Sequence, residues 1–301
     1  MLRVEYIRDG LVEEFHAGEW SLAEPITGMN FDSTENLYYL RSCAKPLQAT
    51  LLIDSNIDLT SEELALCCGS HAGEECHLRV AESIMKKFRL NETMLKCGIH
   101  EPLSRTMQNK MIINGNKPSQ LHNNCSGKHL GFLALCRKNN WDFETYDSPN
   151  HPLQLAIKEK INSMCGVEKE YPMTTDGCGV PILSMPLKNL VRGYINLLNY
   201  PQILNAIKSN PYIFGGEDRI DTAIIQNSEN LIAKVGAGGL CVVLNVKEKN
   251  ALAVKIHDAS TEARKFAVLE LINKLGWGNI KCDNSIRTIA GKIVGQVVIS
   301  L

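Results

Sequence analysis

The sequence predicts an α+β fold in which both chain ends build one mainly antiparallel sheet and a helical domain is inserted between them. Three observations support this: strand-like runs in the first 24 residues, helical periodicity from about residue 42 to about residue 210, and β-branched runs in the last third. We expect residues 1–40 and 215–301 to form the α/β sheet domain and residues 41–214 the mainly helical domain. The 301 residues suffice for one large domain or two packed ones.

The N-terminal segment predicts a β-hairpin. Residues 4–7 and 11–15 are strand-like and flank Asp9-Gly10. This dipeptide favours a type I′ turn, because both central residues of that turn have positive φ. The chain is therefore expected to begin with two antiparallel strands.

The middle of the chain carries helix signals. Thr60-Ser61-Glu62-Glu63 has the pattern of a capping box, in which threonine and the glutamate three residues later satisfy free N–H groups at a helix start. Residues 78–88 are amphipathic and end in basic residues, as the helix dipole favours. Residues 153–164 and 187–198 are further candidate helices.

The last third returns to strands. Residues 240–246 and 251–256 are rich in β-branched and apolar side chains, and the four polar residues between them suit a hairpin. Ser260 or Thr261 then caps a helix, and residues 295–301 close the chain as a final strand. These strands complete the sheet that the N-terminal hairpin begins.

The composition excludes several classes of protein. Hydrophobic residues make up 44% of the chain and the formal net charge is -1, so no global field attracts nucleic acid or an anionic membrane. The apolar stretches are too short to span a bilayer, and the start lacks the pattern of a signal peptide, so we expect a cytoplasmic protein. The 11 cysteines are odd in number and include no C-x-x-C pair, which indicates reduced thiols.

A candidate nucleophile follows a strand-like segment at residues 37–40. Ser42-x-x-Lys45 precedes Pro46, which fits the first turn of a helix, and the three-residue offset puts serine and lysine on one face. A serine hydroxyl needs a base, and lysine can be that base if burial or nearby positive charge lowers its pKa. The helix start offers N–H groups to an oxyanion. The motif alone is weak, because it recurs at Ser83-x-x-Lys86 within an amphipathic helix.

Two companions strengthen the prediction. Ser70 lies in a glycine-flanked break between two predicted helices, and Lys234-Val235-Gly236 opens the strand-rich third. The β-lactamase group carries S-x-x-K, S-D-N and K-T-G in this order. Neither companion is literal, because His71-Ala72 follows Ser70 and valine replaces threonine. The differences favour a relative with another substrate.

With these motifs in order, the sequence resembles the bacterial asparaginase II family, also called type III, which has a glutaminase and serine β-lactamase-like fold. The resemblance implies hydrolysis of L-asparagine, a small-molecule substrate, to L-aspartate and ammonia. It also implies two Ser–Lys pairs beside a zinc ion, with no organic cofactor. The matching segments are residues 40–48, 70–74, 122–129, 176–181 and 234–237.

The resemblance also implies roles for individual residues. The catalytic pairs are Ser42 with Lys45 and Ser70 with Lys234; by analogy with β-lactamases Ser42 attacks and Lys45 is its base, and the alternative is attack by Ser70. An acidic residue is expected where this chain has Gly238, which bears on substrate contacts and not on the hydrolytic core. The implied substrate-binding residues are Arg41, Asn124, His129, Asp176, Gly236 and Ala237.

The candidate metal site is Cys125, Lys128 and Cys178. From spacing alone, two buried thiols and a surface lysine are the simpler interpretation, because lysine is an unusual zinc ligand. The resemblance implies instead one zinc ion per chain on these three side chains, with a fourth position for water or substrate. Asp176 then lies beside the metal, where it meets the substrate ammonium or orients a ligand.

Two other functions stay open at this point. One is a different amidase on the same scaffold, either a glutaminase or a penicillin-recognising enzyme. The other is a catalytically silent zinc- or amino-acid-binding protein, against which the intact Ser–Lys pairs argue. We expect a homodimer with no nucleic-acid or membrane partner, although the sequence does not itself give the oligomeric state.

Overall fold

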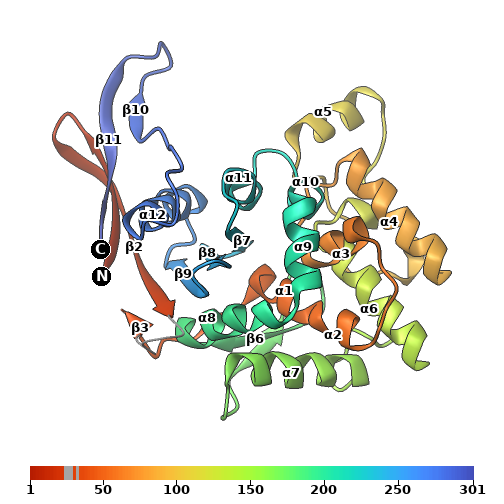
Figure 1. Cartoon of the computed structure of the whole chain (residues 1–301). Coiled ribbons are helices and arrows are strands. Elements are labelled where there is room, and N and C mark those ends of the chain that lie inside the picture. The colour runs from red at the N-terminus through yellow and green to blue at the C-terminus, as the bar shows by residue number, and fades with distance from the viewer. Residues whose placement is uncertain (24–29, 32–33) are drawn as a thin grey trace.

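Strands from both ends of the chain form one antiparallel sheet, in the order β10-β11-β1-β2-β9-β8-β7 with β3 paired to β2 (Figure 1). The computed structural model of the chain describes residues 1–23, 30–31 and 34–301. The α+β fold class is confirmed. The strands of this sheet are β1 (Leu2–Arg8), β2 (Leu11–Ala23), β3 (Asn30–Phe31), β7 (Leu231–Gly236), β8 (Leu240–Asn245), β9 (Asn250–Ile256), β10 (Ser285–Arg287) and β11 (Ile293–Ser300).

The predicted N-terminal hairpin is present. Its turn has φ of 45° at Asp9 and 86° at Gly10, the positive values that a type I′ turn requires. β1 pairs with β2 on one side and with β11 on the other, and Tyr6 lies opposite Val297. The two chain termini therefore lie side by side (Figure 1).

Helices occupy most of the chain between β4 and β7. Thr60 and Glu63 form the predicted capping box, with hydrogen bonds of 2.8 and 3.3 Å, and Ser260 caps the C-terminal helix. The helices are α1 (Lys45–Gln48), α2 (Thr50–Asp54), α3 (Ser61–Cys68), α4 (Glu75–Phe88), α5 (Arg105–Ile113), α6 (Ser126–Asn139), α7 (Pro152–Cys165), α8 (Leu187–Asn196), α9 (Pro201–Ser209), α10 (Pro211–Phe214), α11 (Ile220–Gln226) and α12 (Thr261–Lys274).

A small second sheet lies beside the helices of the region predicted to be mainly helical. β4 (Tyr38–Tyr39), β5 (Met173–Thr175) and β6 (Pro181–Met185) are antiparallel, in the order β4-β6-β5. β6 is buried along its whole length, so it shows no alternation of polar and apolar residues that could indicate a strand. The turn between β5 and β6 carries Asp176 and Cys178.

The large sheet is covered on both faces. In β8, Val242 and Leu244 belong to the core shared with the helical region, and Cys241 and Val243 belong to the core beneath α11 and α12. α8 packs on the first face against β2 and β9, and α12 packs against β1, β9 and β11. Burial on both faces explains the continuous apolar run at residues 240–244.

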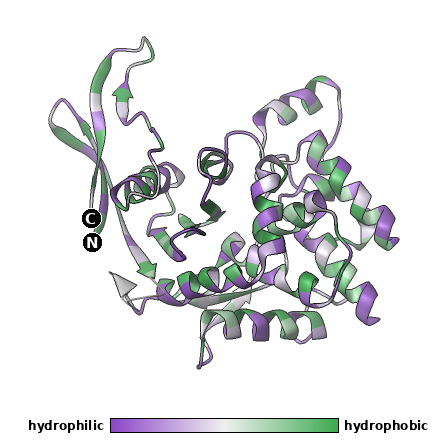
Figure 2. Ribbon diagram, viewed as in Figure 1, coloured by the Kyte–Doolittle hydropathy of each residue, from purple (hydrophilic) through white to green (hydrophobic). Residues whose placement is uncertain are grey.

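The surface helices are amphipathic. In Figure 2 several of them carry hydrophobic residues on one side and hydrophilic residues on the other.

Over residues 1–23, 30–31 and 34–301, no helix combines the length and apolar character needed to cross a membrane. The predicted domain boundaries near residues 41 and 214 stay a prediction.

The contact between α3 and α6 depends on Gly127. A Cβ atom at this position would lie 2.5 Å from the carbonyl oxygen of Leu66 and 2.7 Å from its Cγ. Real Cβ atoms do not come this close to a backbone atom, so any side chain would push the two helices apart. α3 ends and α6 begins at the candidate site, because Ser70 follows α3 and Lys128 lies in the first turn of α6.

We expect Gly127→Ala to destabilise the protein, because overpacking a tight core contact costs about 1–3 kcal/mol. The matched control is Gly278→Ala, whose added Cβ would meet Ile272 Cγ2 at 3.6 Å, an ordinary contact. Thermal unfolding of both variants checks this, with a lower Tm expected only for Gly127→Ala. Equal Tm values would show that α3 and α6 can separate without cost.

Candidate active site

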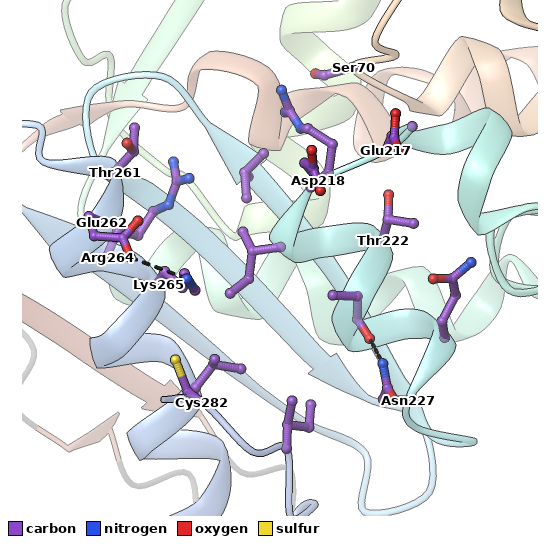
Figure 3. A pocket seen from close by; sticks show the side chains of 18 of the residues that line it. Ser70, Glu217, Asp218, Thr222, Asn227, Thr261, Glu262, Arg264, Lys265 and Cys282 are labelled. Carbon is purple, nitrogen blue, oxygen red and sulfur yellow. Dashed lines mark hydrogen bonds and ion pairs between the residues drawn. The ribbon is translucent and has the colours of Figure 1, made fainter. Parts of the chain in front are cut away.

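A cleft with a volume of about 1320 Å³ lies beside β7 and α11. Figure 3 shows Ser70 at one end of the view and Cys282 at the other, with Arg264 and Lys265 between them. The cleft brings together residues from segments far apart in the sequence. Five of the predicted site residues line it: Ser42, Ser70, Asn124, Gly236 and Ala237.

Ser42 lies in a short 3-10 helix, η1 (Arg41–Ala44), between β4 and α1. Arg41 has φ of 46°, a left-handed conformation that is uncommon outside glycine and often occurs at functional sites. Cys43 anchors the segment, because its Sγ donates to the Lys234 carbonyl oxygen at 3.2 Å and its own carbonyl accepts from Tyr194 at 2.8 Å. These contacts hold η1 against β7 and leave Ser42 partly exposed in the cleft.

Lys45 is buried behind the cleft, with 1% of its surface exposed. Its Nζ lies 2.7 Å from the Gly69 carbonyl oxygen and 2.9 Å from both the Asn124 carbonyl oxygen and Ser70 Oγ. A carbonyl oxygen can only accept, so a neutral Lys45 gives its two N–H groups to the carbonyls and turns its lone pair toward the serine hydroxyl. Burial lowers the pKa of Lys45, which favours this neutral form.

Lys234 contacts the same hydroxyl. Its Nζ donates to Ser70 Oγ at 2.9 Å and to the Val235 carbonyl oxygen at 2.8 Å. Burial lowers the pKa of Lys234 to about 8, although the nearby Asp221 carboxylate opposes this shift. Ser70 itself is 1% exposed, and its N–H donates to the Phe214 carbonyl oxygen at 3.0 Å.

The pairing of lysines with serines differs in part from the expected one. Ser70 and Lys234 are in contact, but Lys45 Nζ contacts the hydroxyl of Ser70 instead of that of Ser42. Over the residues that the structure describes, the Ser42 hydroxyl has no side-chain hydrogen bond. The reason is that the buried Nζ of Lys45 needs polar partners, and the Gly69 and Asn124 carbonyls supply them on the side where Ser70 lies.

The two cysteines and the lysine predicted as metal ligands converge; we refer to Cys125, Lys128 and Cys178 as the thiol cluster. Lys128 Nζ lies 2.8 Å from Cys178 Sγ, and all three side chains are buried. A hydrogen bond from Cys178, together with the nearby Lys45 and Lys128, holds the pKa of Cys125 well below its usual range. The same hydrogen bond and burial raise the pKa of Cys178, so Cys125 is the thiolate of the pair.

The donor chemistry of the thiol cluster fits zinc. Two sulfur atoms and one amine come from the start of α6 and the β5–β6 turn, and one sulfur is favoured as a thiolate. A conventional cluster is absent, since no three or more His, Cys, Asp or Glu side chains within the described ranges are placed to hold a metal ion. Lys128 would be the third donor to such an ion and would have to lose its proton to bind.

The other predicted substrate-binding residues lie near the thiol cluster. Asp176 Oδ1 accepts a hydrogen bond of 2.6 Å from Arg41 Nε, and its Oδ2 lies 3.6 Å from Cys178 Sγ. Although burial opposes the shift, Lys128 and Arg41 hold the pKa of Asp176 below its usual value. His129 is fully buried against Tyr146 and does not line the cleft. Gly238 has φ of 73°, which an acidic side chain rarely adopts.

Two buried residues contact the site although no sequence motif indicates them, Asp221 and His71. Asp221 lies 3.5 Å from Lys234 Nζ, but nothing in its spacing links it to Lys234. His71 directly follows Ser70; its Nδ1 accepts from the Gly73 N–H, so its Nε2 donates to Ser126 Oγ at 2.8 Å. The hydrogen bond from His71 to Ser126 joins the loop that carries Ser70 to the start of α6. In the sequence, only the position of His71 next to Ser70 could have indicated this contact.

The whole chain is similar in sequence or fold to several known proteins. Among curated proteins none matches this chain. A β-lactamase from Mycobacterium bovis shares 13% identity over 91% of this chain and 94% of its own, with a TM-score of 0.40. A β-lactamase/D-alanine carboxypeptidase from Pseudomonas syringae shares 12% identity over 90% and 93%, with a TM-score of 0.42. The family model described as L-asparaginase II matches residues 4–297, and the chain therefore belongs to the L-asparaginase II family.

Proposed function

We propose that this protein is an L-asparaginase, which hydrolyses the side-chain amide of L-asparagine to L-aspartate and ammonia through a covalent acyl-enzyme. Membership of the L-asparaginase II family supports an amidohydrolase. The observation that carries the mechanism is the contact of one buried hydroxyl, Ser70 Oγ, with two lysine amines at 2.9 Å each. Such an arrangement moves protons to and from a reacting serine without a histidine.

Ser42 is the nucleophile in this proposal. It is partly exposed in the cleft, whereas Ser70 is 1% exposed and enclosed by Lys45 and Lys234. Over the described part of the chain the Ser42 N–H has no hydrogen-bond partner, so it can donate to a developing oxyanion, while the N–H of Ser70 is committed to Phe214. Attack by Ser70 is the alternative that the labelling experiment below distinguishes.

The proposed proton steps use the contacts of Ser70 Oγ with Lys45 and Lys234. They require the Ser42 hydroxyl to turn toward Ser70 Oγ when the substrate is bound. As Ser42 Oγ bonds to the amide carbon, its proton passes to Ser70 Oγ, and the Ser70 proton passes to the neutral Lys45. The tetrahedral intermediate collapses when the proton taken up by Lys45 passes through Ser70 Oγ to the amide nitrogen, which leaves as ammonia, so that Lys45 is neutral again. Water then attacks the ester and its proton passes through Ser70 Oγ to Lys45. As the ester C–O bond breaks, this proton returns to Ser42 Oγ, which releases aspartate and free Ser42.

The charged groups beside Ser42 suit an amino acid. Asp176 is anionic and Arg41 is cationic, and the two are paired at the start of η1. An α-ammonium group can approach the Asp176 carboxylate, and an α-carboxylate can approach the Arg41 guanidinium. Gly236 and Ala237 line the same cleft as Ser42. The cytoplasmic location and the homodimer expected from the sequence are part of this proposal.

We also propose that one zinc ion binds to Cys125, Lys128 and Cys178. The convergence of the three side chains and the thiolate character of Cys125 support this. When bound, the ion supplies positive charge beside Asp176 and keeps both sulfur atoms deprotonated. Asp176 then orients the site through its contacts with Arg41 and Cys178.

The first experiment compares substrates. We expect ammonia release from asparagine with a higher kcat/KM than from glutamine, and no turnover of nitrocefin. One methylene is worth about 1–3 kcal/mol in a pocket, so a ratio of about 10 to 200 is the range that binding alone supplies. Comparable kcat/KM for the two amides would favour the glutaminase alternative, and nitrocefin hydrolysis would favour a penicillin-recognising enzyme.

The second experiment identifies the nucleophile. A diazo-ketone analogue of asparagine should label Ser42, as peptide mass spectrometry can show, and Ser42→Ala should form no adduct. The control is Ser83→Ala, which removes the exposed serine of the second S-x-x-K segment and should leave labelling and turnover unchanged. Label on Ser70, together with an adduct in Ser42→Ala, would assign the attack to Ser70.

The third experiment tests the metal. Elemental analysis should find one zinc per chain in the wild type and little in Cys125→Ala and Cys178→Ala. Cys136→Ala, a fully buried thiol of α6 outside the cluster, should retain the metal. If the ion tunes substrate binding, a chelator should raise KM more than it lowers kcat. A zinc content that is the same in all four proteins would contradict the proposed ligands.

A further inference from the structure

Asp221 is a fully buried carboxylate at the start of α11 that the mechanism above does not use. Its Oδ2 lies 3.5 Å from Lys234 Nζ and accepts the N–H of Val235 at 3.3 Å. Its Oδ1 has no hydrogen-bond partner over the residues that the structure describes and lies 3.7 Å from Arg219 Nε. Burying a carboxylate with an incomplete set of partners is costly, which points to a role beyond packing.

The two lysines that touch Ser70 have different surroundings. Lys45 has the carbonyls of Gly69 and Asn124 as its other hydrogen-bond partners, and these cannot neutralise a charge. Burial lowers the pKa of Lys45, and the nearby Cys125, which favours its protonated form, is opposed by the cation of Lys128. Lys234 has a carbonyl and the Asp221 carboxylate. Two ammonium groups on one hydroxyl repel each other, so the lysine with the carboxylate keeps its proton more readily.

We propose that Asp221 is a positioning residue for the amide hydrolysis described above: its carboxylate holds Lys234 as an ammonium group with one N–H directed at Ser70 Oγ. This inference rests on the proposed function. It fixes the direction in which Ser70 transfers its proton, because a hydroxyl oxygen that accepts from Lys234 donates its own hydrogen to the other side. Asp221 does not touch the substrate.

The hydrogen-bond geometry matches this assignment. An ammonium at Lys234 donates to Ser70 Oγ at 2.9 Å and to the Val235 carbonyl at 2.8 Å, and its third N–H is free to face Asp221 Oδ2, with which it forms an ion pair at 3.5 Å. A neutral amine, whose two N–H groups serve the first two acceptors, would have none to direct at the carboxylate. The ring of Phe214, 5.4 Å from Nζ, covers the ammonium and favours a cation there.

The charges around Lys234 come from every element packed on it. Burial disfavours the protonated form of Lys234, as do the charge of Arg219 and that of Lys45 when Lys45 takes up a proton, whereas the Asp221 carboxylate from α11 favours it. Together they lower the pKa of Lys234 to about 8. Lys234, Arg219 and Arg264 in turn keep the pKa of Asp221 below its usual value despite burial. Removing the carboxylate therefore lowers the pKa of Lys234 further.

The test is the pH dependence of kcat/KM in the wild type, Asp221→Asn and a control. Because Lys234 must stay protonated, wild-type activity should fall as the pH rises through about 8, the pKa of that group. In Asp221→Asn this falling limb should move to lower pH by about one unit, a loss of about fivefold at pH 8 that approaches tenfold at higher pH. Asp9→Asn, the same change in the exposed hairpin turn, should leave the profile unchanged. A falling limb at the same pH in Asp221→Asn would overturn the inference.

A second measurement does not depend on activity. Thermal unfolding of Asp221→Asn, Lys234→Met and the double variant measures the coupling of the two side chains. If they form a pair, each single variant lowers Tm and the double variant loses less than the two losses combined. Losses that simply add would overturn the pairing. A wild type that releases no ammonia from any amide would instead refute the proposed function, and the unfolding result would still decide the pairing.

Discussion

The active site depends on the burial of two lysine side chains against one serine hydroxyl. Lys45 is 1% exposed and Lys234 is fully buried, and a buried cation or amine without polar partners is expensive. The partners come from the end of α3, the loop before α6, β7 and α11, so the fold has to bring four separate segments to one point. Those partners are the carbonyls of Gly69, Asn124 and Val235 and the carboxylate of Asp221.

To bring these segments together, the backbone has to approach its neighbours closely beside Ser70 and beside Lys234. At both places a glycine, which has no Cβ, allows the close approach. A Cβ at Gly69 would overlap the carbonyl oxygen of Phe214, the same oxygen that accepts the N–H of Ser70. A Cβ at Gly236 would lie 3.1 Å from Cys43 Sγ, which holds η1 against β7. The glycines that flank the motifs are therefore part of the catalytic geometry, because a side chain at either would displace a serine or a lysine.

Local signals allowed much of the fold to be predicted, whereas the contacts inside the site were not accessible from sequence. The Asp9-Gly10 turn and the Thr60 and Ser260 caps depend only on residues within a few positions. The acceptors of Lys45 are 24 and 79 residues away, and no spacing rule predicts them. The three-residue offset from Ser42 to Lys45 suggested a pair that the buried carbonyls override. Asp221 was missed for the same reason, since its contact with Lys234 arises only when α11 packs on β7.

Lys45 connects the Ser70 hydroxyl to the thiol cluster. Its Nζ is 2.9 Å from Ser70 Oγ, and on its other side the Cys125 thiolate favours its protonated form while Lys128 opposes it. The thiol cluster thus adjusts the proton affinity of the proposed base. Lys234 receives the corresponding influence from Asp221. The two lysines that contact the Ser70 hydroxyl therefore differ in their counter-charges. Because of this difference Lys234 keeps its proton, and the proton of Ser70 passes to Lys45.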